Sequence, residues 1–208
     1  MTTYLFNRYH KLILSVFLFC SLILCSVCDG FCAAGTVWDE SLRLHVLAAS
    51  DSEEDQRVKL LVRDALLTES GKLFCGSENA REAAEKIIEN KEELENIADK
   101  VLQENGFSYR ATVSIEDEYF ETREYDEVKL PAGTYTACKV VLGDGDGKNW
   151  WCIMFPPLCI PAATAENEES VYAVYGEKGG NLVTGKSGYV IKFRIVEIIE
   201  EIINKVKS

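Results

Sequence analysis

The cysteines are the residues of this sequence best suited to covalent or metal chemistry. Of the eight, four lie in or beside an apolar N-terminal segment and four follow it: Cys75, Cys138, Cys152 and Cys159. Six residues, among them Pro156 and Pro157, separate Cys152 from Cys159. If the domain is exported, it meets oxidising conditions, and we then expect a Cys152–Cys159 disulfide across the proline bend. The alternative is a pair of reduced, buried thiols.

Other arrangements of these groups have weaker support. A zinc site would need four ligands from the four cysteines and His45, yet none of them form a Cys-x-x-Cys pair. Cys152 and His45 could serve as nucleophile and base, but no known motif surrounds Cys152. The sequence also lacks a serine nucleophile elbow, a phosphate-binding loop and a His-Glu-x-x-His motif. We therefore predict no catalytic residue, metal or cofactor. An exported thiol- or metal-dependent enzyme stays as an alternative.

The run Asp144-Gly145-Asp146-Gly147 has the beginning of a calcium-binding loop. Such a loop needs an oxygen ligand at its fifth position and a glutamate at its twelfth. Those positions are Lys148 and Phe155. The run therefore predicts a tight turn.

Adjacent tryptophans, Trp150 and Trp151, follow this turn. Neighbouring side chains of a strand point to opposite faces, so one ring can enter the core while the other needs a cover. The C-terminal helix could cover it, or a protein partner could, since tryptophan is favoured at interface hot spots. The candidate partner-binding residues are Asn149, Trp150, Trp151 and Phe155.

The elements that position these residues can be predicted from hydrophobic periodicity. Residues 42–48 alternate as a half-buried strand, and Ser50 with Glu53 forms a capping-box pattern for a helix that ends near Ser70-Gly71. A longer helix is expected over residues 78–104, where Asn105-Gly106 stops it.

The second half of the chain changes to a strand period. We expect strands over residues 109–115, 120–125, 134–142 and 150–155, with the last two paired as a hairpin through residues 143–147. Residues 162–189 are expected to be loop-rich, with a short strand at 171–175. An amphipathic helix over 190–206 should bury an apolar stripe of Ile191, Ile195, Ile198, Ile199, Ile202 and Val206. The predicted fold is a single α+β domain, with a mostly antiparallel sheet, two helices after the first strand and a C-terminal amphipathic helix.

The N-terminus has the pattern of an export signal. Arg8 and Lys11 precede residues 12–27, which carry no charge. Cys32 and Ala34 fit a small-x-small cleavage pattern, so we expect a signal peptide over 1–34 and an exported domain over 35–208. An uncleaved N-terminal anchor is the alternative.

Composition restricts the function further. The net charge of −12 disfavours binding to nucleic acid, which needs a basic surface. A hydrophobic content of 47% is sufficient for a core and too high for a disordered chain. Nothing in the pattern suggests a small-molecule substrate.

Three blocks of the sequence resemble one known family. The first block comprises Arg43 to Ser52 together with Asp55-Gln56, Lys59 and Val62-Arg63-Asp64-Ala65. The second is Leu130-Pro131-Ala132-Gly133-x-Tyr135. The third comprises Asn149-Trp150-Trp151-Cys152 and Phe155-Pro156-Pro157-Leu158-Cys159. In this order, over residues 40–160, they resemble stage II sporulation protein R; Ala49 departs from the asparagine expected there.

The resemblance implies a function that composition could not reveal. Proteins of this family are made in the forespore of endospore-forming Firmicutes and exported into the space between the forespore and mother-cell membranes. There they trigger a membrane-embedded aspartic peptidase, which removes the pro-sequence of sigma-E. The implied partner is the extracytoplasmic face of that peptidase. A structural envelope protein is a further alternative.

The resemblance assigns no contact residues, so the remaining motif residues are structural candidates. We expect five charged residues to form a network beside the first strand and helix: Arg43, Asp51, Asp55, Arg63 and Asp64. His45, Pro156 and Pro157 are the other candidates for a structural role.

Overall fold

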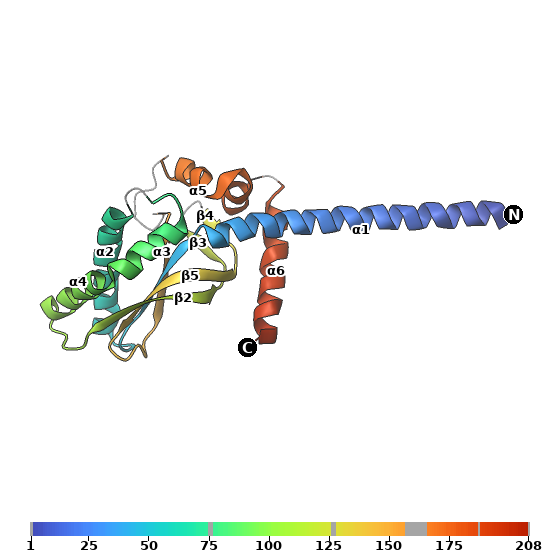
Figure 1. Cartoon of the computed structure of the whole chain (residues 1–208). Coiled ribbons are helices and arrows are strands. Elements are labelled where there is room, and N and C mark those ends of the chain that lie inside the picture. Colours follow the sequence, from blue (N-terminus) through green and yellow to red (C-terminus); the bar gives the residue numbers. More distant parts are fainter. Residues whose placement is uncertain (1, 75–76, 126–127, 157–165, 187, 208) are drawn as a thin grey trace.

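A computed structural model describes residues 2–74, 77–125, 128–156, 166–186 and 188–207. A long N-terminal helix enters an α+β body, and a C-terminal helix lies across it (Figure 1). The elements in chain order are α1 (Thr2–Asp39), β1 (Leu42–Leu47), α2 (Glu53–Leu73), α3 (Ala80–Glu89), α4 (Lys91–Glu104), β2 (Ala111–Phe120), β3 (Arg123–Tyr125), β4 (Val128–Leu130), β5 (Gly133–Leu142), β6 (Asn149–Phe155), α5 (Glu166–Val183) and α6 (Val190–Lys207). The predicted α+β class is confirmed.

The main sheet has the strand order β2-β5-β1-β6, and β3 pairs with β4 in a separate ribbon. β1 runs parallel to β5 and antiparallel to β6, and β2 is antiparallel to β5. The predicted hairpin of residues 134–155 is therefore wrong, because β1 lies between its two strands. The turn between them is instead bound to the segment after β1, where Gly147 N donates to Ala48 O at 2.9 Å. A Cβ at Gly147 would lie 2.2 Å from Ser50 O, so this crossing requires glycine.

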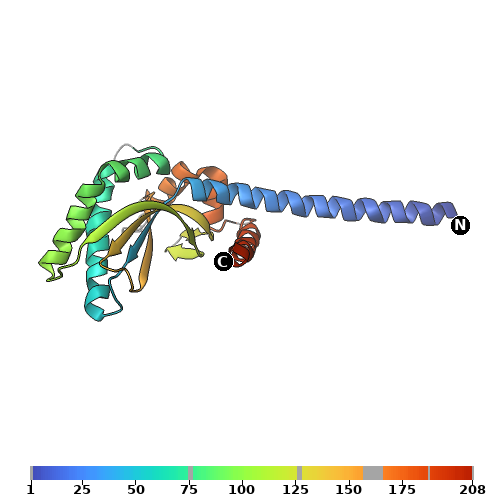
Figure 2. The same ribbon diagram turned by 60° about the horizontal axis from the view of Figure 1, so that its bottom comes forward.

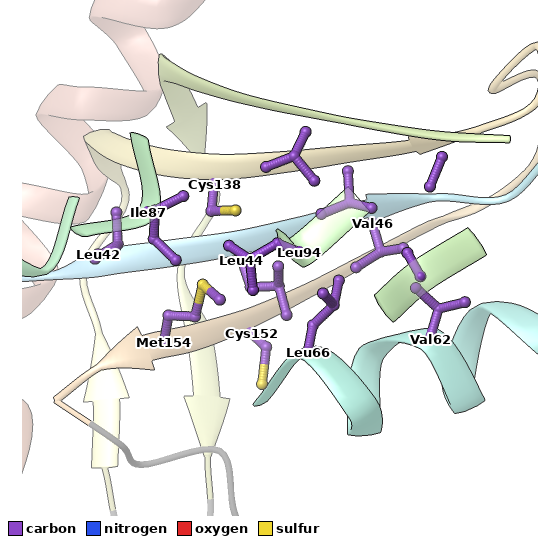
Figure 3. Close-up of a cluster of buried hydrophobic side chains, with 14 of the residues drawn as sticks. Leu42, Leu44, Val46, Val62, Leu66, Ile87, Leu94, Cys138, Cys152 and Met154 are labelled. Carbon is purple, nitrogen blue, oxygen red and sulfur yellow. The ribbon is translucent and has the colours of Figure 1, made fainter. Parts of the chain in front are cut away.

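α2, α3 and α4 cover one face of the main sheet. Leu42, Leu44 and Val46 of β1 point into this core, where Figure 3 shows them among side chains of all three helices. Val62 and Leu66 of α2 contribute to the same core. Because residues 42, 44 and 46 share one side of a strand, the alternation predicts this face correctly.

The helices begin and end at places that the sequence pattern only approximated. α2 is capped by Ser52, whose side chain accepts a hydrogen bond from Asp55 N at 3.1 Å, so the predicted capping box at Ser50 is wrong. α2 also extends past Ser70-Gly71 to Leu73. The single helix expected over residues 78–104 is divided at Asn90, which has φ −106° and ψ 19° and ends α3 while starting α4. This break turns the two predicted helices into three.

The segment expected to be loop-rich contains α5, with non-helical backbone at Gly176. The prediction of a strand at 171–175 is wrong. Val171 and Tyr175 are four residues apart, which places them on one face of a helix as well as on one face of a strand, and both are buried. Glycines weaken a helix pattern, but here they permit close packing. A Cβ at Gly179 would lie 3.4 Å from a Val37 methyl of α1 and 2.9 Å from Tyr175 Cβ.

α1 joins two different environments in one continuous helix. Its large apolar side chains from Tyr9 to Leu24 are exposed, whereas Ala33, Ala34 and Val37 are completely buried among other elements. The segment Tyr9–Asp39 is long and apolar enough to cross a membrane. This is compatible with a signal peptide, and the expected domain boundary at residue 34 stays a prediction.

The predicted C-terminal helix is confirmed, but its orientation is not the expected one. The buried residues of α6 are Phe193, Val196 and Glu197. Ile191, Ile198, Ile202 and Val206, which were expected to face the core, are exposed. Ile195 and Ile199, the other two members of the predicted stripe, are half-buried, so most of the apolar stripe of α6 points away from the domain.

Candidate partner-binding surface and the polar cluster beside it

The two tryptophans lie on opposite sides of β6, as predicted. Trp150 is 37% exposed on the α2 side, and the guanidinium of Arg63 lies 4.6 Å from its ring centroid. β6 ends the strand order of the main sheet, and Asn149 is exposed at its start. Trp150 and Arg63 therefore form an accessible surface on the α2 side of this sheet edge, whereas the side chain of Asn149 points to the opposite face, toward His45. Phe155, grouped with them by sequence, is buried against Phe74 and belongs to the core.

Trp151 lies on the opposite face and is half-buried. Its ring centroid is 5.4 Å from that of His45 and 6.1 Å from that of Phe120. The guanidinium of Arg123 in β3 lies 4.6 Å from the Trp151 ring centroid. The cover that the sequence assigned to the C-terminal helix or to a partner is thus supplied partly by β3.

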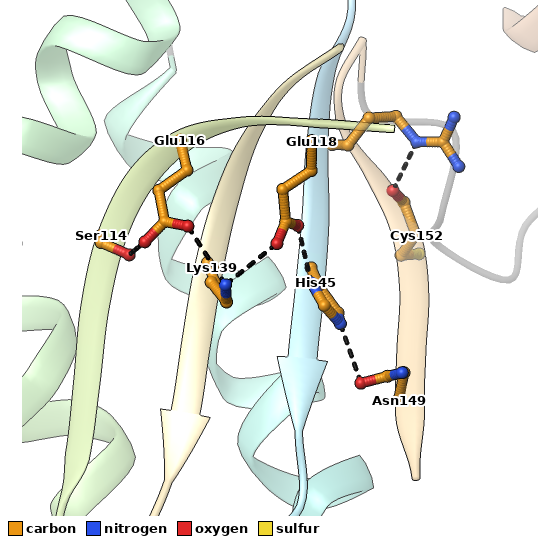
Figure 4. A network of polar contacts seen from close by, with 8 residues as sticks. His45, Ser114, Glu116, Glu118, Lys139, Asn149 and Cys152 are labelled. Atoms are coloured by element: carbon orange, nitrogen blue, oxygen red, sulfur yellow. Dashed lines mark hydrogen bonds and ion pairs between the residues drawn. The ribbon is translucent and has the colours of Figure 1, made fainter. Parts of the chain in front are cut away.

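His45 is held between two polar partners beneath this ring. Its Nδ1 is 2.7 Å from Glu118 Oε2 and its Nε2 is 3.0 Å from Asn149 Oδ1 (Figure 4). Lys139 extends the cluster, because its Nζ lies 3.1 Å from carboxylate oxygens of both Glu116 and Glu118. Hydrogen bonds that Lys139 donates to Glu118 and Glu116 raise the pKa of Lys139. Both ring nitrogens of His45 are therefore engaged by side chains of the same domain.

The Cys152–His45 pair considered from the sequence is not formed. In the β1–β6 register Cys152 stands opposite Leu44 and His45 opposite Trp151, so the two side chains point to opposite faces. Cys152 is buried in the helix-covered core, as Figure 3 shows, and is disulfide-bonded. Its predicted partner Cys159 lies outside the described residues, as does Cys75.

Cys138 and the run 144–147 are the other candidates that fall within the described residues. Cys138 is a free thiol whose pKa burial raises to about 12, which leaves it a poor nucleophile at neutral pH. Within the described residues, no cluster of three or more histidine, cysteine, aspartate or glutamate side chains could hold a metal ion. The run 144–147 forms the predicted turn, in which Gly145 N donates to Leu142 O at 3.1 Å.

Arg43 is completely buried on the same face as His45. Its guanidinium carbon lies 4.2 Å from the Phe120 ring centroid and 4.8 Å from that of Tyr135. Nε donates to Cys152 O at 3.1 Å, and one terminal nitrogen donates to Tyr125 Oη at 2.8 Å. Arg43 thus ties β1 to β6 and β3 through aromatic stacking and hydrogen bonds.

The other charged motif residues lie elsewhere, so the predicted five-residue network is not one network. Asp55 accepts hydrogen bonds from Ser50 and from Tyr109 Oη at 2.5 Å. Asp51 Oδ1 accepts from Lys148 N at 2.8 Å and holds the β5–β6 turn. Arg63 and Asp64 form their own ion pair at 2.6 Å on α2.

Pro156 and Pro157, which were expected to have a structural role, follow the tryptophan strand β6. Pro156 is buried and follows Phe155 through a cis peptide bond. Pro157 lies outside the described residues.

Sequence reasoning missed four residues that build the cluster: Glu116, Glu118, Arg123 and Lys139. Lys139 stands in a segment of alternating residues, and pairing that segment in register with β1 would have placed it beside His45. Glu118 stands opposite Tyr135 in the β2–β5 register, so strand register alone does not place it beside His45. Arg123 carries no such signal, because β3 has only three residues and pairs outside the main sheet.

A sequence model for stage II sporulation protein R matches residues 38–165. The chain belongs to the stage II sporulation protein R family. The match covers β1 to β6 and α2 to α4, so the accessible sheet edge and the His45 cluster both lie within the family region. The resemblance predicted from the three motif blocks is thereby confirmed.

A curated relative is the stage II sporulation protein R of Bacillus subtilis (strain 168). It is 37% identical over 121 residues, which are 58% of this chain and 54% of the relative. The chain thus spans about half the length of the relative that it matches. No solved structure matches the chain.

Proposed function

We propose that this protein is an exported signal between the two compartments of a sporulating cell. It is made in the forespore and passes into the space between the forespore and mother-cell membranes. There it triggers the membrane-embedded aspartic peptidase that removes the pro-sequence of sigma-E. Membership of a sporulation family and the apolar helix α1, which is compatible with export, support this proposal.

The proposed contact surface is based on one observation, the accessible edge of β6. Trp150 is partly exposed there, with Arg63 stacked on it, and tryptophan and arginine are the residues most enriched at binding hot spots. An edge strand also offers unpaired backbone groups to a partner. We propose that Trp150 and Arg63, at the sheet edge that begins with Asn149, contact the extracytoplasmic face of the peptidase.

Such contact activates the peptidase only if it favours the active state. A ligand shifts an equilibrium by the difference between its affinities for the two states. The protein must therefore bind the active peptidase more tightly than the resting one. Equal affinity for both, measured by titration against a trapped active and an inactive form, would contradict this mechanism.

The experiment is a reconstitution in a host that does not sporulate. The full chain is co-expressed with the cognate peptidase and pro-sigma-E, and shortening of the substrate is followed on a gel. Shortening should depend on this protein. No shortening with folded, exported protein would overturn the activator role, and would leave the structural envelope protein as the better reading.

Point variants then locate the contact. Trp150→Ala should reduce shortening strongly, because it removes the exposed ring and uncovers Arg63. Ile88→Ala is the matched control, since Ile88 is also a large exposed apolar residue but lies on α3. Equal loss in both variants would remove β6 as the contact. Retained activity in Cys138→Ala and His45→Gln would argue against a thiol-dependent enzyme.

A further inference from the structure

α6 is amphipathic with its polar side toward the domain. Glu197, Glu201 and Asn204 line a hollow against Tyr119 and Thr122, at the end of β2 and just beyond it. The opposite side is apolar and exposed: Ile191 is 71%, Ile198 43%, Ile202 56%, Ile203 37% and Val206 82% exposed. A helix that serves only to close a core has the reverse orientation. This side of α6 therefore lacks a cover among the described residues.

α6 lies across α1 at the place where α1 leaves the domain (Figures 1 and 2). Phe193 and Val196 form a buried cluster with Ala33 and Ala34 of α1. The two helices approach so closely that a Cβ on Gly30 would lie 3.2 Å from Lys192 Cβ. Both views show α6 running crosswise to α1 rather than alongside it.

The contacts also define which way the apolar side of α6 points. Phe193 lies against Ala33 and Ala34, whereas Lys192 Nζ pairs with Asp29 Oδ2 at 2.6 Å, one turn nearer the N-terminus of α1. Each residue turns the helix by 100°, so Lys192 follows Phe193 in one direction around α6. Ile199 and Ile195 lie beyond Lys192 in that same direction. These isoleucines thus point along α1 toward its exposed apolar run, away from the sheet.

The apolar run of α1 is suited to the hydrocarbon layer of a membrane. Residues 12–27 carry no charge, and their large side chains from Leu12 to Leu24 are exposed. Sixteen helical residues extend about 24 Å, which is most of the roughly 30 Å hydrocarbon thickness of a bilayer. Once this run lies in lipid, the next turn, with Asp29, comes to the membrane surface, and α6 comes with it.

We propose that α6 is an interfacial membrane helix, with its isoleucine side in the surface of the bilayer that α1 enters. An amphipathic helix of this kind lies in the membrane plane with its apolar side in the boundary between headgroups and acyl chains. Lys205 and Lys207 in its last turn are long enough to extend toward headgroups. The arrangement requires that α1 stay attached, and it orients the domain with respect to the membrane.

The test uses the full chain in phosphatidylcholine vesicles whose acyl chains carry bromine, which quenches nearby tryptophan fluorescence. Ile202→Trp places a probe on the isoleucine side, and Glu201→Trp places one at the adjacent position on the domain side. Val206→Trp repeats the first measurement at a side chain that is 82% exposed, so folding is not at risk there. The three native tryptophans contribute equally to every variant.

The added tryptophan at positions 202 and 206 should lose about half of its fluorescence or more, because an interfacial helix inserts about 5–10 Å into the headgroup boundary. The probe at position 201 should keep its fluorescence. Equal quenching at all three positions, or none at 202 and 206, would overturn the proposal. Unquenched probes together with a dimer in light scattering would mean that a second copy covers this side of α6. The assay contains no peptidase, so its outcome does not depend on the proposed function.

Discussion

The two faces of β1 show two ways of burying a strand. Leu42, Leu44 and Val46 pack into hydrocarbon beneath α2, α3 and α4. Arg43 and His45 are buried as well, at 0% and 7% exposure, but among aromatic rings and hydrogen-bond partners. The first face tolerates any well-packed apolar group, whereas the second needs specific partners from β2, β3 and β6. β1 therefore supports the tryptophan strand β6 on both faces of the sheet, with apolar side chains on one face and with Arg43 and His45 on the other.

The largest effect on stability should come from the apolar face. Leu44→Ala should lower the free energy of unfolding by about 3 kcal/mol, because a fully buried leucine leaves a cavity. Urea unfolding of the full chain in detergent measures this. Ile88→Ala, at an exposed position, should change stability by less than about 0.5 kcal/mol. A Leu44 variant as stable as the Ile88 variant would mean that this face is not the core.

The stability contributed by the polar face of β1 should depend on hydrogen bonds and ring stacking rather than on side-chain volume. Arg43→Lys should cost about 2 kcal/mol, because an ammonium group cannot reproduce the planar stacking or both hydrogen bonds. Leu44→Met, a similar change in shape on the other face, should cost less than about 1.5 kcal/mol. If the lysine variant were as stable as wild type, Arg43 would be acting only as a buried charge.

One carboxyl group on the helix-covered side makes stability depend on pH. Burial acts to raise the pKa of Asp55, but hydrogen bonds from Ser50, Tyr109 and Ser52 outweigh it and hold that pKa below its ordinary value. Its contribution is therefore complete above the ordinary carboxyl pKa and is lost as the pH falls through the lower folded value.

Asp55→Asn should accordingly cost about 1 kcal/mol at neutral pH. Unfolding curves of wild type and variant, compared from neutral pH downward, should converge below about pH 4. A difference that stays constant with pH would show that the charge of Asp55 is not the cause.

The smallest effect is expected within the His45 cluster. A double-mutant cycle of His45→Gln and Glu118→Gln should give a coupling of about 0.5 kcal/mol, because Glu118 remains partly accessible and also binds Lys139. Urea unfolding of the four proteins measures it. A coupling of several times that size would make this cluster as important as the opposite core.

Much of the structure followed from local pattern. Alternation at residues 42–48 and 134–142 predicted β1 and β5, and the spacing of isoleucines predicted α6 as a helix. The motif blocks predicted the family, which the comparison confirmed. The helix α5 was missed because its glycines lower helix propensity, which tertiary packing can restore. The division at Asn90 was missed because apolar residues continue at a helical spacing on both sides of it.

Of the candidate surface, sequence placed Trp150 and Trp151 on opposite faces but could not say what covers them. Arg63 and Arg123 lie far from β6 in the chain, and only folding brings their guanidinium groups onto the two rings. Phe155 was grouped with the tryptophans by proximity in sequence, yet it belongs to the core. Residues close together in a strand share an environment only when the elements packed around them bury or expose them alike.

The sequence by itself determined the family, the helical and strand character of most segments, and the presence of an apolar N-terminal run. These depend on side-chain type and on periods of two or 3.6 residues, which are local properties. Tertiary structure alone decided that β1 separates β5 from β6, that Cys152 and His45 face opposite ways, and that α6 turns its isoleucines outward. Each of these depends on which distant segment packs against which face, and a local period gives a face without saying what will lie against it.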